Sequence, residues 1–347
     1  MLKKFSQIAL LLILILALFA FNWKSSGTLS TYSNSRFLED KLADVSVSYA
    51  LDMMNEERPL HYIMNVSDDS ARMGEELVKF GKLKDGSTSR ISKYFLCTDC
   101  HNQQLETDDP ADESPERVLE YSKKNNIPFL PASTFYGMFN KEHWYNGDYA
   151  KKYGDLVKPT RDTLFNAIQL CATQCSQGRE MEDWEIRSVM HYYKSIELKV
   201  CDLKFNSREY GEFTAYMSSN NKKAVELLKS KYNQINDAHF GTSEIPKIEG
   251  YEPSAENGEF IYKQGCLHCH AVGRNITNFD LDDTKLTHKF LLAKKNKYNS
   301  FSVSHITRYG TYAISGRKQY MPMYSFENMS DEQMLDLMFY IEKKATE

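Results

Sequence analysis

Two short stretches decide the fold of this chain: Cys97–His101, which reads CTDCH, and Cys266–His270, which reads CLHCH. In each, two residues separate a pair of cysteines, and a histidine follows directly. A zinc site of the finger type needs a second Cys or His pair at a set spacing, and neither stretch has one. A thioredoxin-like redox pair needs a βαβ pattern around it, which the sequence also lacks.

The Cys-x-x-Cys-His spacing is the attachment signature of haem c. The two sulfurs reach two vinyl groups on one edge of the porphyrin, and the next residue turns its imidazole under the ring to bind iron. The sequence therefore predicts two covalently bound haems. The predicted attachment residues are Cys97, Cys100, Cys266 and Cys269, and the predicted proximal iron ligands are His101 and His270.

Similar segments lead into both motifs. Gly74–Gly81 and Gly258–Gly265 share their length and their end residues. Each predicts an opening helix that ends at a glycine in a left-handed cap. The second segment runs straight into its motif, whereas the polar residues 82–96 come before the first. This repeat predicts an all-α fold with two cytochrome c-type haem domains in tandem.

A closing helix is also predicted in each half. Ser330–Gln333 is a capping box, and an apolar face at helical spacing follows it. In the first half the counterpart starts near Asp183. We expect domains at residues 24–202 and 248–347, joined by a connector at 203–247 that holds one amphipathic helix from Lys222 to about Gln234.

The N-terminal residues 1–23 predict a signal peptide or a membrane anchor. Lys3 and Lys4 precede an apolar run from Ile8 to about Phe21. Both alternatives export the rest of the chain, and thioether attachment of haem takes place outside the cytoplasm. The expected location is therefore the periplasm, with the N-terminal helix either removed or left in the membrane.

Charge and composition narrow the choice of partner. The formal net charge is −4 and the pI about 6.2, so nothing indicates nucleic-acid binding. The acidic stretch Glu106–Glu116, with two prolines, predicts a surface loop. The expected partner is a redox protein, either another cytochrome or a respiratory complex.

The sixth iron ligand of the second haem is predicted to be Met321. This methionine stands before Pro322, about fifty residues after the motif and ahead of the last helix, and the segment resembles the ligand loop of small class I cytochromes c. The proline would stiffen the loop that presents the sulfur. Met323, His305 and His288 are the alternatives.

Residues 168–181 lie where the first haem would find its sixth ligand. Ile168, Cys171 and Gly178 fall at the spacing of a helix found in thiosulfate dehydrogenases and SoxA-type cytochromes, which this chain resembles. The resemblance implies that the Cys171 thiolate binds iron. It also implies a cysteine-ligated first domain followed by a methionine-ligated second one.

Other residues could take the same role, and the resemblance is incomplete. The alternative ligands are Met181, Cys175, Met138 and His143. The family's Asn is Gln169 here and its Arg is Ala167, which leaves Arg161 and Arg179 as candidate substitutes for a basic substrate pocket. A purely structural interpretation instead joins Cys175 to Cys201 in a disulfide and leaves Cys171 free.

These features favour an exported dihaem electron carrier. A thiolate ligand lowers a haem's reduction potential and a thioether raises it, so electrons would enter at the first haem and leave through the second. One alternative is an oxidoreductase like thiosulfate dehydrogenase, with the cysteine-ligated haem as its reaction centre. Another is a haem subunit of a membrane respiratory complex.

Overall fold

The computed structural model describes residues 42–234, 237–241, 244–274, 276–277, 279–294, 302–311 and 321–347. The predicted N-terminal signal or anchor lies outside these ranges. Within them, no helix is both long enough and apolar enough to cross a membrane. Ser46–Glu347 form one compact unit that contains both motifs.

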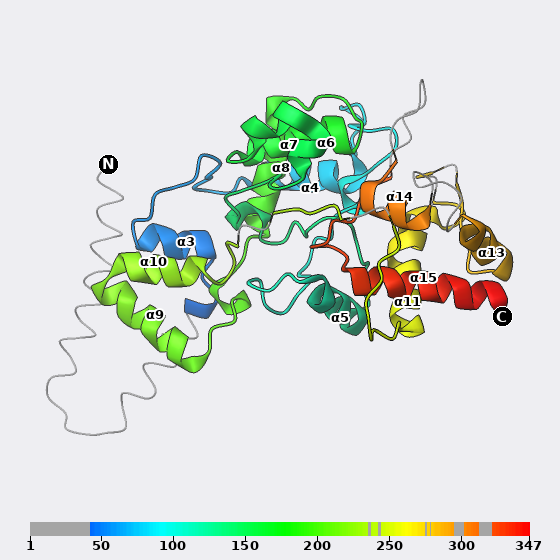
Figure 1. Cartoon of the computed structure of the whole chain (residues 1–347). Helices are drawn as coiled ribbons and strands as arrows, with labels where there is room; N and C mark the ends of the chain where they lie inside the picture. The colour runs from blue at the N-terminus through cyan, green and yellow to red at the C-terminus, as the bar shows by residue number, and fades with distance from the viewer. Residues whose placement is uncertain are drawn as a thin grey trace, which may run out of the picture. The chain divides into compact units, whose positions relative to one another are not determined.

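The described part of the chain is mostly helical and contains no strand, only isolated bridges, as the predicted all-α fold requires. In chain order the α-helices are α3 (Val47–Met53), α4 (Asp68–Phe80), α5 (Pro115–Asn125), α6 (Tyr149–Tyr153), α7 (Leu164–Leu170), α8 (Asp183–Ser195), α9 (Ser207–Ser219), α10 (Asn221–Lys229), α11 (Ala255–Ile261), α12 (Leu267–His270), α13 (Lys285–Ala293), α14 (Val303–Tyr309) and α15 (Asp331–Thr346) (Figure 1).

The two halves use the same helix crossing. Helix α4 packs against α8, and α11 packs against α15. A Cβ atom on Gly74 would lie 2.0 Å from the Ser188 carbonyl oxygen, and one on Gly258 would lie 2.0 Å from the Asp336 carbonyl oxygen. Each crossing therefore needs a residue without a side chain, which explains why a glycine opens both copies of the repeat.

The two glycines that close the repeat behave differently. Gly81 has φ +67° and caps α4 in the left-handed region, as predicted. The same expectation for Gly265 is wrong, because it lies within a π-helical turn, Tyr262–Cys266, that continues into α12. Its Cβ would instead meet the Phe129 carbonyl oxygen at 3.1 Å, so this glycine permits a close approach between segments.

The helices enclose two main apolar cores. The first packs the inner faces of α4, α7 and α8 with residues 135–144. The second packs α11, α13 and α15, and it also takes in Leu119 of α5 and Phe129. Residues 115–130, which precede much of the first core in the chain, thus pack with the C-terminal helices.

The predicted closing helices are confirmed. Ser330 caps α15 by accepting from the Gln333 amide, and the Gln333 side chain accepts from the Ser330 amide. Helix α8 begins at Asp183, behind a similar box of Glu182 and Glu185.

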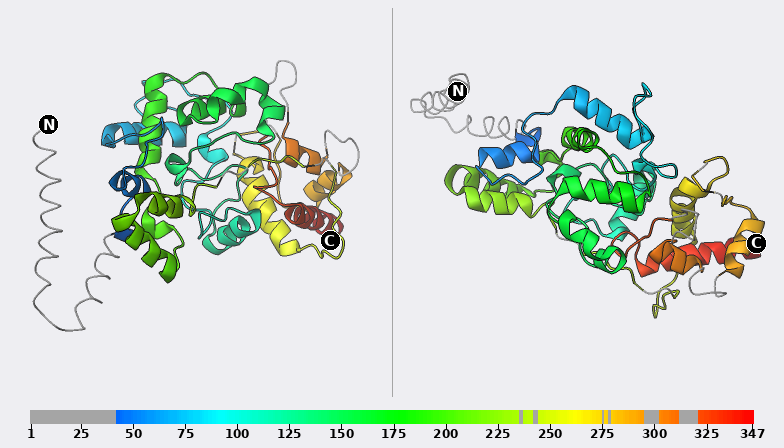
Figure 2. Two further views of the ribbon diagram at one scale, coloured as in Figure 1. Left: turned by 60° about the vertical axis from the view of Figure 1, so that its left-hand side comes forward. Right: turned by 90° about the horizontal axis from the view of Figure 1, so that it is seen from above.

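The connector contains two helices where one was predicted. Helices α9 and α10 lie side by side in both views of Figure 2, and α10 ends at Lys229, earlier than expected. The signal missed for α9 is a capping box of Asn206 and Glu209, which precedes a helix with only Phe213 fully buried. The proposed domain borders stay a prediction.

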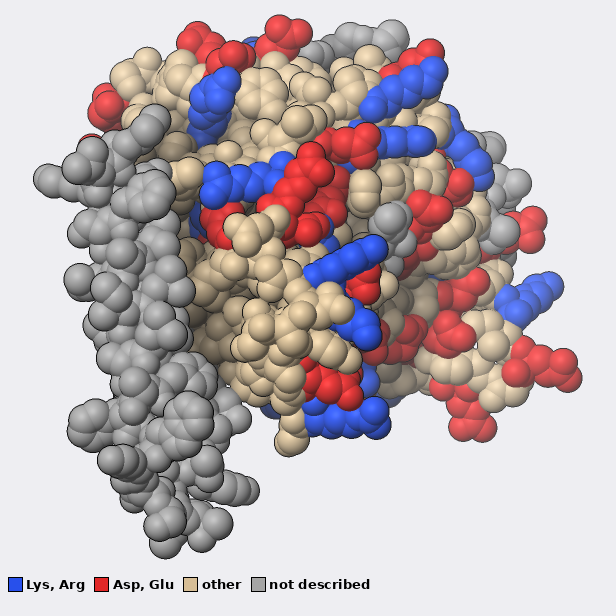
Figure 3. Space-filling model, turned by 90° about the vertical axis from the view of Figure 1, so that its left-hand side faces the viewer, with Lys and Arg blue, Asp and Glu red and all other residues tan. Residues whose placement is uncertain are grey.

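Figure 3 shows acidic and basic side chains interspersed over one face of the molecule. Ion pairs within the described residues include Lys229 Nζ, which lies 2.7 Å from Glu56 and 2.9 Å from Glu142, and Lys231 Nζ, which lies 2.6 Å from Glu209. Because this surface mixes both signs, it is unlike the single-sign basic surfaces that bind nucleic acid.

Candidate functional site

The first motif is a tight turn. Cys97–Asp99 form a 3-10 helix, and the Cys97 carbonyl accepts from the amides of Cys100 and His101 at 3.3 and 3.1 Å. The Asp99 carboxylate closes the turn by accepting from the Leu96 amide at 2.7 Å. The turn brings Cys97, Cys100 and His101 to the wall of one cavity.

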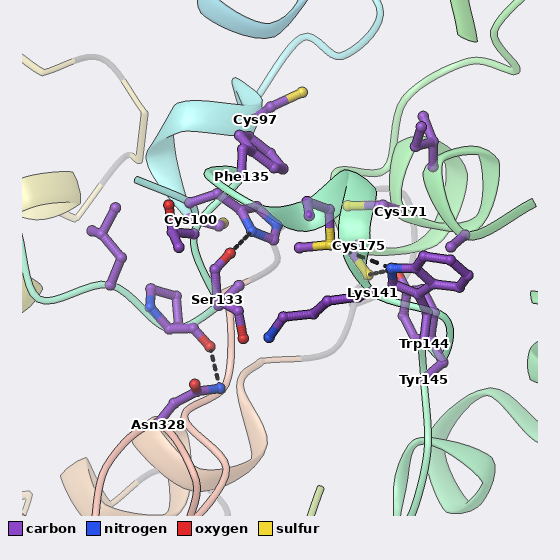
Figure 4. Close-up of a pocket in the computed structure, with 18 of the residues that line it drawn as sticks. Cys97, Cys100, Ser133, Phe135, Lys141, Trp144, Tyr145, Cys171, Cys175 and Asn328 are labelled. Atoms are coloured by element: carbon purple, nitrogen blue, oxygen red, sulfur yellow. Dashed lines mark hydrogen bonds between the residues drawn. The ribbon is translucent and has the colours of Figure 1, made fainter. Parts of the chain in front are cut away.

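The His101 ring is oriented for metal binding. Its Nδ1 donates to the Ser133 carbonyl oxygen at 2.6 Å, which leaves Nε2 as the basic nitrogen (Figure 4). Phe135 stacks on the imidazole at 4.3 Å between ring centroids. Burial lowers the pKa of His101 to about 4, so the ring is neutral at pH 7, as an iron ligand must be.

The cavity in front of His101 has a volume of about 320 Å³. Cofactor and small-molecule sites run from roughly 300 to 1,000 Å³ and are mostly apolar. Aromatic and aliphatic side chains provide most of this wall, and the C-terminal half adds Pro322, Met323 and Asn328. The size, the apolar lining and the sulfur and imidazole donors all fit a covalently held haem.

The second motif repeats the histidine arrangement. His270 closes α12, and its Nδ1 donates to the Phe279 carbonyl oxygen at 2.7 Å, so Nε2 is again the basic nitrogen. Burial lowers the pKa of His270 as well. Phe279 and Phe290 lie close together beside it and remain partly exposed, as expected for rings that a porphyrin would cover.

Two thiols line the same cavity as His101. Cys171 and Cys175 are the ends of a π-helical turn that follows α7 (Figure 4). The Tyr153 and Tyr145 hydroxyls lie 3.4 and 3.6 Å from Cys175 Sγ. The hydrogen bond with Cys171 is the main cause that holds the pKa of Cys175 below its usual range, and it raises that of Cys171.

The structure brings all five predicted sixth-ligand candidates for the first haem to this cavity. Three of them already have other partners. The Met138 sulfur accepts from Trp144 Nε1 at 3.3 Å, and His143 pairs with Asp162 at 3.2 Å. Met181 packs in the first core. Cys175 also has partners, the Tyr145 and Tyr153 hydroxyls, so the contacts do not single out one of the five candidates and the sixth ligand stays a prediction.

The residues around this turn have identifiable tasks. The Gln169 side chain accepts from the Met181 amide at 3.0 Å and donates to its carbonyl at 3.2 Å, so this departure from the family pattern holds the following loop. A Cβ on Gly178 would lie 2.4 Å from the Ile91 carbonyl oxygen. The glycine of the pattern is therefore needed for close chain approach.

Neither arginine offered as a substrate-binding substitute lines the cavity. Arg179 forms a two-pronged ion pair with Glu185 at 2.6 and 2.7 Å. Arg161 is exposed. The lysine that lines the cavity, Lys141, lies 2.6 and 2.7 Å from the Glu113 carboxylate oxygens. Among the residues that the structure describes, no arginine of the kind expected for an anionic sulfur substrate lines the pocket.

The disulfide between Cys175 and Cys201 is not formed, and none of the seven cysteines, all within the described ranges, is in a disulfide. Cys201 is exposed, whereas Cys175 lines the cavity beside Cys171. The interpretation is wrong because the turn after α7 points Cys175 inward.

Met321 lies at the start of the final loop, where its amide donates to Thr311 Oγ1 at 2.8 Å. Its role as ligand of the second haem stays a prediction. Two of the alternative ligands are buried. Met323 lines the first cavity. His288 is fully buried, and its Nε2 lies 2.9 Å from an Asp283 carboxylate oxygen. His305 stacks on Tyr309.

One residue that the sequence placed on the surface is buried. Glu106 is 8% exposed and lines the first cavity. Its carboxylate accepts from Asn102 Nδ2 at 2.7 Å and from the Thr134 amide at 2.8 Å. The acidic stretch is therefore not a surface loop throughout, because local charge does not reveal that a later segment covers Glu106.

Comparison with known proteins agrees with the geometry of the second site. The chain matches no curated protein and no solved structure. The family model described as Cytochrome c matches residues 255–344, which run from the start of α11 almost to the end of α15 and include the second motif. Residues 255–344 therefore form a class I cytochrome c-like domain, which carries covalently bound haem c.

Proposed function

We propose that this chain is an exported dihaem cytochrome that passes electrons from a donor to a redox partner protein. Haem-based electron transfer follows from the cytochrome c domain at residues 255–344. The haem at the first motif rests on one observation: Cys97, Cys100 and His101 line the same apolar cavity as the Cys171 and Cys175 thiols.

Each residue in these sites would have a defined task toward the haem. When bound, haem supplies an iron that gains and loses one electron. Cys97 and Cys100 would hold the first haem and Cys266 and Cys269 the second. The Ser133 and Phe279 carbonyls orient the two imidazoles, and their hydrogen bonds make Nε2 more basic. The apolar side chains that line the first site would surround the haem there.

The direction of transfer follows from the ligands. A thiolate from Cys171 or Cys175 would stabilise the oxidised iron at the first site, and the Met321 thioether would favour the reduced iron at the second. The first haem would thus have the lower reduction potential, so electrons would enter there and leave through the second domain.

Haem counting and electron paramagnetic resonance (EPR) test this proposal. We expect two haems per purified chain and one after the C97A/C100A double substitution. In the oxidised protein, C171S or C175S should remove a thiolate-ligated low-spin signal, while the exposed Cys201→Ser serves as the matched control. A single haem in the unmodified chain, or equal potentials for the two haems, would contradict the proposal.

A second candidate is an oxidoreductase that acts on sulfur compounds at the first haem. It is favoured by the pair of thiols in the cavity and disfavoured by the absence of a cavity-lining arginine among the described residues. Adding thiosulfate to the oxidised protein decides between them. Reduction of the haems that C171S abolishes would support the enzyme, and no reduction with intact thiolate ligation would reject thiosulfate.

A further inference from the structure

The two Cys-x-x-Cys-His motifs touch one another through Asp99 and Cys269, which are 170 residues apart in the chain. Cys269 Sγ lies 3.8 Å from the Asp99 carbonyl oxygen. One of the two cysteines that would hold the second haem therefore lies against the turn that would hold the first.

His268 also lies at this contact. It stands between the two cysteines of the second motif, and its ring lies beside the Thr98 carbonyl, between the two cysteines of the first. Arg274 makes two contacts with His268. Its Nη2 lies 3.1 Å from the ring Nδ1 of His268, and its Nε donates to the His268 carbonyl oxygen. Residues between the cysteines of each motif thus lie at the contact between the two motifs.

A short segment, 129–132, joins both motifs from a third side. At one end, the Phe129 amide donates to the Gln264 carbonyl, just before the second motif, at 3.3 Å. At the other end, the Ala132 amide donates to the Cys100 carbonyl at 3.2 Å. Tyr324 adds a hydroxyl bond of 2.8 Å to the Phe129 carbonyl.

We propose that the direct contact of the two motifs, held by His268 and the 129–132 segment, sets the spacing of the two haems and couples them magnetically and electrostatically. The proposal rests on the proposed function, because it needs both haems to be attached. His268 would act as a positioning residue: its own neighbours are backbone atoms and Arg274, and it acts through the placement of Cys269.

Gly265 offers a way to disturb the contact without touching a ligand. An added Cβ would lie 3.0 Å from the Tyr324 hydroxyl and 3.1 Å from the Phe129 carbonyl oxygen, so the packing of these groups against the second motif must give by a few tenths of an ångström. Gly211 in α9 is the matched control, because a Cβ there has nothing within 4 Å. His268→Ala is a second variant that removes the ring between the motifs.

The experiment compares the unmodified chain with G265A, H268A and G211A, each carrying its haems. EPR of the fully oxidised protein measures spin–spin coupling between the irons. EPR-monitored potentiometry measures how far oxidation of one haem disfavours oxidation of the other, which we expect to be roughly tenfold for unit charges at short range inside a protein.

We expect coupling in the unmodified chain and in G211A, and weaker coupling in H268A and in any folded G265A protein. The inference is overturned if the unmodified chain holds two haems without coupling, or if H268A retains the full coupling. A pyridine haemochrome count separates these failures from that of the proposed function, because only the latter would leave the unmodified chain with one haem.

Discussion

The buried carboxyl of Glu106 makes the stability of this protein depend on pH. Burial raises its pKa from 4.5 to about 7, and this outweighs the hydrogen bonds from Asn102 and Thr134, which lower it. A carboxyl whose pKa is higher in the folded state than in the unfolded state prefers to fold protonated. Its contribution is fully present below pH 4.5 and is lost as the pH rises through about 7.

The size of the effect follows from the two pKa values. Each pH unit between them is worth about 1.4 kcal/mol, so the folded protein loses roughly 3 kcal/mol between pH 4.5 and pH 7 from this group. Glu106→Gln is neutral at every pH and removes this slope. Glu120→Gln, at an exposed carboxyl of α5, should keep it.

Denaturant unfolding of the haem-bound proteins at pH 5 and pH 8 provides the assay. The difference in unfolding free energy between E106Q and the unmodified chain should change by about 3 kcal/mol between the two pH values, with E106Q gaining as the pH rises. Parallel pH dependence in the two proteins would refute the reasoning, because burial would then not govern the Glu106 carboxyl.

Three further outcomes are expected. Gly74→Ala should destabilise the protein by about 1–3 kcal/mol in thermal unfolding, because the added Cβ overlaps a carbonyl of α8. Gly211→Ala, where the added Cβ meets open space, should leave the stability unchanged. Equal effects of the two substitutions would show that the α4–α8 crossing can adjust. Arg308→Met should lower the free energy of unfolding in denaturant by about 2–4 kcal/mol, because the buried guanidinium donates to several carbonyls of the final loop. A smaller loss would mean that water reaches these carbonyls in the variant. Met321→Ala should lower the potential of the second haem in potentiometry and Met323→Ala should not, so an unchanged potential in M321A would reject Met321 as the ligand.

Local patterns were sufficient for several features. The capping box at Ser330–Gln333 and the start of α8 at Asp183 were predicted from short-range signals, because a cap involves residues three apart. The left-handed cap at Gly81 was also correct. The same prediction for Gly265 was wrong. A glycine can be required either by a left-handed backbone conformation or by close packing, and only the neighbours of the position in the fold decide between the two.

Features that depend on distant segments were not predictable. Nothing near Glu106 in the chain shows that Thr134 will cover it. The sequence offered five candidates for the sixth ligand of the first haem and no geometry to rank them. Only the fold shows that Met138 and His143 have other partners. The capping signal of α9 was present and was missed, because the helix has little apolar periodicity.

By itself, the sequence predicts haem attachment at the two Cys-x-x-Cys-His motifs, since that chemistry needs only five consecutive residues with fixed spacing. Only the tertiary structure decided what surrounds each motif. Whether Cys175 faces Cys201 or Cys171, and whether the motif at Cys97 touches the motif at Cys266, depends on how segments up to 170 residues apart pack, and no local spacing encodes such contacts.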